Sequence, residues 1–520
     1  MPNLRLIIRM ATILGILTVV TYGFAQADAR PSLRVALPAL PASLDIGGGF
    51  SNPDHAVPYS IFDSLIHKDH TSVQPVYIPG LATSWERVSD TVLVLKLREG
   101  VRFHNGDAMT AEDVKFSLER FSKADYPLYE TPRGIAFGNI ERVEVVNPTT
   151  VRVVTVKPEP ALEAILSMPQ AAIIPQAYVE EIGYEAFGRT PVGTGPYRVT
   201  EFVLEERVTL AVFENFWGEQ PNAGEIIFRS IPELASRITA LVNDEVDIVT
   251  NVPPDQVATI EGSDCCETRD ILSNIFHVLY FNSAHPLMQD KTFRQALSLA
   301  IDRQLLVDAL WGGQAKVPPG HQFPQFGDIY MPDYPPPAYD PERARELLEA
   351  SSYEGETITF HTASTYYTNG LLAAQAVTEM WKAIGVNTQL LVDVNTEDFW
   401  TEVMVANWSN PLYFTDPAGS YGVMYSPEGF RGSDRWTGRH DEYRALYDRF
   451  RYTLDLEERK KLYREVLGYW EDFVPATILY QPIEFYGVRK GVNWQPLPGS
   501  QTYILDFRAD NLSFERQASR

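Results

Sequence analysis

The most regular hydrophobic pattern in the chain lies between residues 79 and 120, where strand and helix signals follow one another directly. Residues 91–97 (TVLVLKL) are rich in β-branched and aliphatic side chains, which predicts a strand. An Asn-Gly pair at 105–106 supplies the backbone freedom of a tight turn. Thr110 stands three residues before Asp113, the spacing that caps a helix N-terminus. The stretch therefore predicts a hairpin, a turn and a capped helix in succession.

The same two patterns continue along the rest of the chain. Period-two hydrophobic runs predict strands at residues 33–37, 140–156 (a hairpin), 197–202, 207–212, 226–231, 247–249, 278–282, 357–361, 388–392 and 477–480. Helical spacing predicts helices at residues 59–66, 161–168, 232–242, 293–310, 340–348, 371–384 and 456–473. Strand–helix–strand order at 226–249 and 357–392 implies mostly parallel sheets. We expect an α/β fold of two lobes with an extra β-rich portion near the N-terminus.

The first 27 residues have the composition of a secretory signal peptide. Arg5 and Arg9 precede an apolar run at 10–20, and small residues then stand at the positions before a cleavage site. Cleavage is expected after Ala27, with Ala29 as the second choice. An uncleaved membrane anchor is the alternative, but the run is shorter than the ~20 residues that a spanning helix needs. We expect an exported protein that works in the periplasm.

Composition and charge narrow the possible partners. The chain has 520 residues, 45% of them hydrophobic and 22% charged, which is typical of a folded protein with more than one lobe. The formal net charge of −24 argues against nucleic-acid binding, which needs a basic face. The only two cysteines, Cys265 and Cys266, are adjacent. They allow either a strained vicinal disulfide or a free thiol pair, so the fold is not expected to depend on disulfides.

The sequence contains no motif of a known catalytic centre. Gly193 and Gly195 resemble a phosphate-binding loop only superficially, because Pro196 removes an amide donor and a strand pattern follows. His67, His70 and His104 lack metal-ligand spacing. No nucleophile motif of a hydrolase occurs. We therefore expect a protein that is not an enzyme and holds no cofactor.

A series of ordered motifs resembles a known family. They are PGLA with WE at 79–86, LREGVRFHNG at 97–106, TAEDV at 110–114, GTGPY at 193–197, Gly218 after FW, DEVDI at 244–248, FN at 281–282, RQAL and IDR at 294–303, YDPERA at 339–344 and IGV at 384–386. Together they resemble family 5 extracellular solute-binding proteins, the dipeptide- and oligopeptide-binding receptors of bacterial ABC importers. The resemblance spans essentially the whole chain after the leader.

The resemblance implies a two-lobed periplasmic-binding-protein fold with a hinge and an extra inserted β-rich domain. Domain I would comprise residues 28–60, 190–283 and 485–520. Domain II, the insertion, would comprise residues 61–189, and domain III, the second lobe, residues 284–484. Ligand would be enclosed between the lobes, and closure would present both lobes to a membrane permease.

Candidate ligand contacts follow from the same resemblance. Receptors of this family often hold the amino terminus of a peptide with an acidic residue in a loop after a Trp, and Asp416 is the only carboxylate in the corresponding loop at 407–417. A buried carboxylate suits an ammonium group; the alternative is a turn residue before Pro417. The other candidates for the cavity wall are Trp408, Tyr366, Tyr367, Phe50 and Trp400, the last of which also suits the core. Arg431, Arg435 and Arg439 could pair with a ligand carboxylate or be solvated.

The leading hypothesis is a receptor that delivers a small peptide or peptide-like solute to the permease subunits of an ABC importer. A monomer without nucleic-acid partners is expected. An opine, sugar or nickel-chelate receptor on the same scaffold is the alternative, and a secreted hydrolase is a more remote one.

Overall fold

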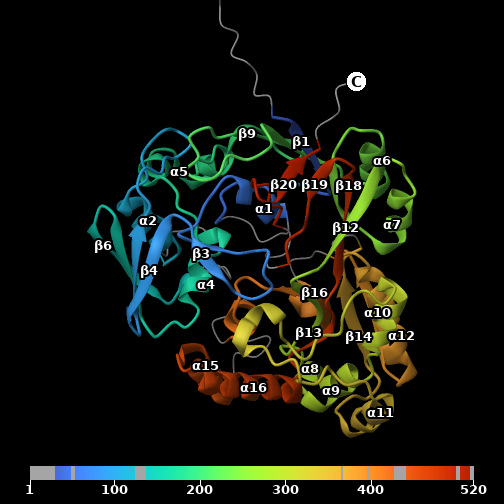
Figure 1. Cartoon of the computed structure of the whole chain (residues 1–520). Helices are drawn as coiled ribbons and strands as arrows, with labels where there is room; N and C mark the ends of the chain where they lie inside the picture. The colour runs from blue at the N-terminus through green and yellow to red at the C-terminus, as the bar shows by residue number, and fades with distance from the viewer. Residues whose placement is uncertain are drawn as a thin grey trace, which may run out of the picture.

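The framework of the molecule is a pair of large β-sheets, one in each lobe (Figure 1). The structure is a computed structural model, and it describes residues 30–47, 53–122, 136–364, 367–394, 399–426, 441–498 and 504–515. The predicted leader, Phe50 and Tyr366 lie outside these residues.

The upper lobe in Figure 1 contains a mixed seven-stranded sheet. Its spatial order is β12 (Cys266–Leu272), β18 (Ile483–Arg489), β11 (Ile248–Val252), β1 (Ser32–Leu37), β10 (Glu225–Ser230), β9 (Arg207–Val212) and β8 (Tyr197–Val203). Only the pairs of β1 with β10 and with β11 are parallel. The prediction of a mostly parallel sheet around 226–249 was wrong: β10, β1 and β11 are parallel, but the other four neighbouring pairs of the sheet are antiparallel. The helices α6 (Leu234–Val242) and α7 (Pro254–Glu261) belong to this lobe.

A second β-rich unit adjoins the first sheet, at the left of Figure 1. Its four strands are ordered β4 (Ala82–Ser89), β5 (Val92–Leu97), β7 (Thr150–Thr155) and β6 (Ile140–Asn147). The predicted helix cap is confirmed: Thr110 and Asp113 form a reciprocal capping box at the start of α2 (Ala111–Glu119). The unit also holds β2 (Ile66–Lys68), β3 (Tyr77–Pro79), α4 (Leu162–Leu166), α5 (Gln176–Arg189), η2 (Arg120–Ser122) and η3 (Pro169–Ala171). The short helix α1 (Pro53–Ala56) lies in the upper lobe (Figure 1), and η1 (Pro58–Ser60) follows it in the chain.

The lower lobe contains a five-stranded sheet with helices on both faces. Its order is β15 (Asn387–Val392), β14 (Thr357–Thr362), β16 (Val405–Pro411), β13 (Ile275–Phe281) and β17 (Ala476–Tyr480). The predicted βαβ unit is confirmed here, since β14 and β15 are parallel and α12 (Gly370–Ala383) connects them. The remaining helices are α8 (Pro286–Gln289), α9 (Lys291–Leu299), α10 (Arg303–Trp311), α11 (Pro341–Ala350), α13 (Phe399–Glu402), α14 (Tyr421–Tyr425), α15 (Asp441–Tyr452), α16 (Leu456–Phe473), η4 (Pro324–Ile329) and η5 (Pro417–Gly419). In the upper lobe, β19 (Val492–Trp494) and β20 (Leu512–Phe514) form a short antiparallel pair (Figure 1).

Two predicted helices were wrong, each because distant parts of the chain provide other partners. Residues 59–66 do not form one helix: the carbonyl of Ile61 accepts from the amide of Gly195, that of Ser64 from Leu81, and β2 then pairs with β3. Residues 293–310 form two helices, because Asp302 caps a new helix by accepting from the amide of Leu305.

The chain passes between the two large sheets at two adjacent crossings. The first lies between β12 and β13, and the second between β17 and β18. The amide of Ser273 donates to the carbonyl of Pro482 (2.9 Å), and the Gln481 side chain donates to the carbonyl of Ser273 (2.7 Å). The crossings are therefore bonded to each other.

The state of the two cysteines and the length of the helices were also considered in the sequence analysis. Cys265 and Cys266 form a disulfide, so the vicinal ring is the state present here. Among the described residues, none of the helices is both long and apolar enough to span a bilayer.

Candidate functional site

Two small hollows lie side by side where the lobes face each other, and we call this region the cleft. Lys68, His70, Ser167 and Pro169 line both hollows. The segment 412–415, which follows β16 in the lower lobe, closes one of them. Each has a volume of about 20 Å³, room for little more than a water molecule. A dipeptide is much larger, so its entry here requires the lobes to separate.

One hydrogen bond spans the cleft directly. The hydroxyl of Tyr77, in β3, lies 2.8 Å from Oγ1 of Thr415 in the lower lobe. Lys68 is close by and only 7% exposed. Burial lowers the pKa of its ammonium group to about 8, and the nearby charge of Asp69 opposes this effect. The cleft therefore holds a cationic group that is still largely protonated at neutral pH.

An ion-pair network forms the inner wall of the cleft. Arg508, from the C-terminal part of the chain, places Nη1 3.0 Å from the Asp63 carboxylate. Trp217 donates its indole N–H to the same carboxylate (2.9 Å), and His67 lies 3.3 Å from it. Burial raises the pKa of Asp63, but Arg508 and the hydrogen bonds outweigh it and lower the pKa to about 2. The network attaches the C-terminal segment to the wall that carries Lys68.

Asp416 is buried beside the cleft and already has a cationic partner. Its two carboxylate oxygens accept hydrogen bonds of 2.6 and 2.7 Å from the guanidinium of Arg459, in α16. One oxygen also accepts from the amide of Ala418, so Asp416 caps η5. Burial raises the pKa of Asp416, and Arg459 more than reverses the effect. The role of Asp416 as the partner of a ligand amine stays a prediction.

Trp408 and Tyr367 lie on opposite faces of the lower sheet. Trp408 is half-buried in β16 and packs against an aromatic cluster that includes Phe276. The Tyr367 hydroxyl donates to Oγ of Ser409 (2.9 Å), the residue next to Trp408. Because successive strand residues point to opposite faces, the structure does not bring these two aromatic side chains together on one wall.

The other predicted contacts are not placed at the site. Trp400 belongs to the short helix α13, and its side chain is not among those described. Phe50, Tyr366, Arg431, Arg435 and Arg439 lie outside the described residues. Their roles remain predictions.

A second contact joins the β-rich unit to the lower lobe. Glu159 is fully buried, and its carboxylate accepts a hydrogen bond from the guanidinium of Arg451, in α15. Asn139 also donates to this carboxylate (3.1 Å). At the edge of the contact, Nζ of Lys157 lies 4.2 Å from the centre of the Tyr452 ring. Polar contacts at two places therefore hold the β-rich unit against the lower lobe.

Sequence reasoning did not identify the residues that line the cleft. His67 and His70 attracted attention only as metal ligands, and no group of three or more metal-binding side chains occurs in the described part of the chain. Asp63 and Arg508 are 445 residues apart, so no local pattern relates them. The buried Lys68, between two histidines, was the one signal that could have been noticed.

The sequence is similar to a known protein family and to characterised members of it. Residues 76–431 match the model of the bacterial extracellular solute-binding proteins, family 5 Middle. The dipeptide-binding protein of Escherichia coli K12 is 25% identical over 445 residues, 80% of this chain and 83% of that protein.

Solved structures show the same fold. The periplasmic binding protein DppA of Helicobacter pylori, in complex with the peptide STSA, superposes with a TM-score of 0.80 at 22% identity, covering 93% of this chain and 99% of that one. AgaA from A. tumefaciens R10, in complex with agropinic acid, also gives 0.80 at 22% identity, covering 94% and 99%. The two-lobed fold with an inserted β-rich unit is thereby confirmed.

Proposed function

The chain belongs to the family 5 bacterial extracellular solute-binding proteins, and we propose that it is a periplasmic receptor that binds small peptides and delivers them to an ABC importer. Proteins of this family bind solutes without transforming them, so the chain is a binding protein and not an enzyme. The proposal includes export by the leader at 1–27, a monomeric receptor and the permease subunits of the importer as its membrane partner.

The observation that supports the proposal is the closed cleft between lobes whose backbone connections, in the described part of the chain, are two adjacent crossings at 273–274 and 481–482. Such a connection permits a hinge motion that opens and closes the cleft around a solute. The predicted division was 28–60 with 190–283 and 485–520, 61–189, and 284–484. β13 (Ile275–Phe281) pairs with β16 and β17 in the lower sheet, and β18 begins at Ile483 in the upper sheet. We therefore propose the same three domains with the boundaries of the second lobe moved to the crossings, at 275 and 482.

Charge in the cleft supports a ligand with a carboxylate. Lys68 is cationic at neutral pH and faces the lower lobe beside Thr415. A carboxylate bound next to it would form a charge-assisted hydrogen bond in a region shielded from water. The relative that binds dipeptides and the structure solved with STSA support a peptide as the source of that carboxylate.

The decisive experiment identifies the ligand that the protein carries. Native mass spectrometry of the purified protein would show the mass of a co-purified solute, and thermal shifts would be measured with di- to pentapeptides. A peptide at a hundredfold excess over its Kd should stabilise the fold by roughly 2.7 kcal/mol. If an opine, a sugar or a nickel chelate raises the melting temperature while no peptide does, the peptide assignment is wrong.

A further inference from the structure

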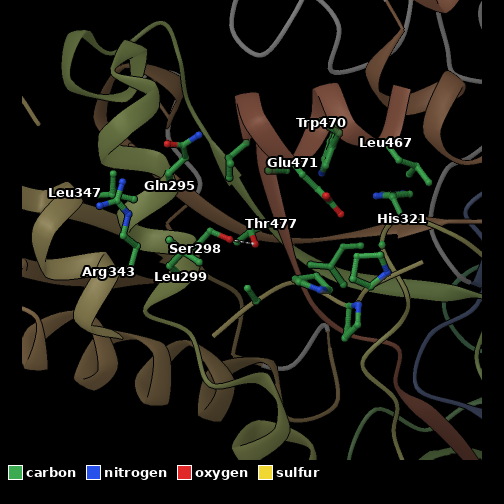
Figure 2. Close-up of a pocket in the computed structure, with 18 residues that line it drawn as sticks. Gln295, Ser298, Leu299, His321, Arg343, Leu347, Leu467, Trp470, Glu471 and Thr477 are labelled. Carbon is green, nitrogen blue, oxygen red and sulfur yellow. Dashed lines mark hydrogen bonds between the residues drawn. The ribbon is translucent and has the colours of Figure 1, made fainter. Parts of the chain in front are cut away.

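A hollow much larger than the two in the cleft lies within the lower lobe. It has a volume of about 460 Å³, inside the range of roughly 300–1,000 Å³ typical of small-molecule sites. Its walls come from α9, α11, α16, β17 and the segment 335–338 (Figure 2). We call it the lobe cavity.

One end of the lobe cavity presents a hydrogen-bond donor with positive charge behind it. The hydroxyls of Ser298 and Thr477 lie 2.7 Å apart, and Nη2 of Arg303 donates to both (3.0 and 2.7 Å). Only one hydroxyl hydrogen is used between them, so the other remains for an acceptor in the cavity.

Arg303 keeps its charge although it is 2% exposed. Burial lowers the pKa of its guanidinium to about 10, which still leaves it protonated at neutral pH. Its other hydrogen bonds go to backbone carbonyls, and none of the ion pairs in the described part of the chain includes it. Arg343 stands at the same end, paired with Glu346 at 2.6 Å. This end of the cavity suits an anionic group.

The opposite side of the lobe cavity carries a carboxylate. Figure 2 shows Glu471 there, beside Trp470 and His321. Surrounding side chains desolvate the Glu471 carboxyl and raise its pKa, while a hydrogen bond from Tyr334 opposes the shift. Among the described residues, Glu471 takes part in no ion pair with Lys or Arg. This side suits an ammonium group.

His321 forms part of the wall on the side of Glu471. It lines the lobe cavity, is 1% exposed, and its Nδ1 has no hydrogen-bond partner in the described part of the chain. Its Nε2 contacts the side-chain amide of Asn410. Apolar side chains complete the walls, among them Leu299, Leu347 and Leu467.

We propose that the lobe cavity is a second ligand site, which binds a small amino carboxylate whose two charged groups are separated by an apolar chain. The carboxylate lies at Ser298 and Thr477, and the ammonium group at Glu471. The site is separate from the cleft and does not depend on the solute that the cleft binds.

The test is a calorimetric titration of the full mature protein with 6-aminohexanoate, hexanoate and hexylamine. We expect 6-aminohexanoate to bind at one site and the two singly charged compounds to bind at least tenfold more weakly. Glu471→Gln should weaken 6-aminohexanoate at least tenfold. Glu465→Gln, an exposed position of the same helix, should change nothing.

A pocket-filling variant separates the lobe cavity from the cleft. Leu347→Trp keeps every charge but occupies the cavity, so it should abolish binding of 6-aminohexanoate while thermal shifts by cleft ligands stay at the wild-type level. The proposal is overturned if the wild type does not bind 6-aminohexanoate at millimolar concentration. It is equally overturned if Glu471→Gln and Leu347→Trp, folded with wild-type melting behaviour, bind the compound as well as the wild type does.

Discussion

Arg451 and Glu159 form a buried ion pair between the lower lobe and the β-rich unit, although 292 residues separate them in the chain. Each side chain is at most 9% exposed. Burial lowers the pKa of Arg451, and Glu159 outweighs this effect and raises the pKa above its usual value. A contact of this kind stabilises the closed arrangement only while both partners are present.

Arg451→Met should therefore weaken ligand binding. The substitution leaves Glu159 buried without a cation in the closed form, and breaking such a pair costs about 3–5 kcal/mol. Opening exposes the carboxylate and relieves part of that cost, so the closed, ligand-bound form is disfavoured. We expect at least a tenfold increase in Kd, about 1.4 kcal/mol, measured by calorimetry with a cleft ligand.

Asp448→Asn is the matched control on the same helix. Asp448 lies 3.5 Å from Lys157 in an exposed pair, and exposed pairs contribute about 0–1 kcal/mol. Equal changes in Kd for Arg451→Met and Asp448→Asn would contradict a special role for the buried pair.

Asp416→Asn should lower the stability of the lower lobe. It removes the charge that neutralises the buried Arg459, and we expect a loss of about 3–5 kcal/mol in the free energy of unfolding, measured with urea. Asp455→Asn, an exposed helix cap, should be nearly neutral because Asn caps as well as Asp.

The same Asp416→Asn variant tests ligand binding. If Asp416 also holds a ligand amine, Asp416→Asn loses affinity for a peptide with a free amino terminus but keeps its affinity for an N-acetylated peptide. An unchanged free energy of unfolding for Asp416→Asn would contradict the role of Asp416 as the partner of Arg459. An unchanged affinity for the free amino terminus would contradict its role in binding the ligand.

Lys68→Gln should discriminate between ligands with and without a carboxylate. We expect at least a tenfold loss of affinity for a peptide with a free carboxyl terminus and little change for its amide, by calorimetry. Because the pKa of Lys68 is about 8, binding of the free acid by the wild type should also weaken as the pH rises through that value. Lys382→Gln, at an exposed position, serves as control. A pH-independent affinity would exclude Lys68 as the carboxylate partner.

Buried histidines should make the protein sensitive to acid. Burial lowers the pKa of His277 and His321 to about 3, whereas an unfolded histidine titrates near about 6.5. Between these values the unfolded chain binds protons that the folded protein does not, so stability falls as the pH falls. Each group contributes a slope of up to about 1.4 kcal/mol per pH unit. His277→Gln should remove one such contribution in urea unfolding between about pH 6 and 4; an unchanged slope would contradict this origin.

The parts of the fold that sequence reasoning predicted are those set by neighbours in the chain. The capping box at Thr110, the hairpin of β6 and β7 and the βαβ unit of β14, α12 and β15 all depend on contacts within a few dozen residues. Helix and strand periodicity is sufficient for such elements. The two-lobed fold itself was predicted from the family motifs and not from these local patterns.

The parts of the fold and the site that were not predicted depend on contacts between residues far apart in the chain, which sequence spacing does not reveal. Residues 59–66 have helical periodicity, yet the carbonyl of Ile61 accepts a hydrogen bond from the amide of Gly195, and the helical part ends with the short η1. The site shows the same limit. Asp416 could be chosen from its loop, but its partner Arg459 stands 43 residues further on, so its ion pair within the protein could not be foreseen.

The two bonded crossings also determine how the molecule can signal that it is occupied. Because Ser273 and Pro482 are joined by a hydrogen bond, the lobes share a single axis of rotation instead of two independent tethers. Displacement grows with distance from an axis, so a small tightening around the solute becomes a larger change in spacing at the far rims of the two lobes. A membrane protein that contacts both rims would distinguish the occupied receptor by the distance between the rims, without contacting the solute itself.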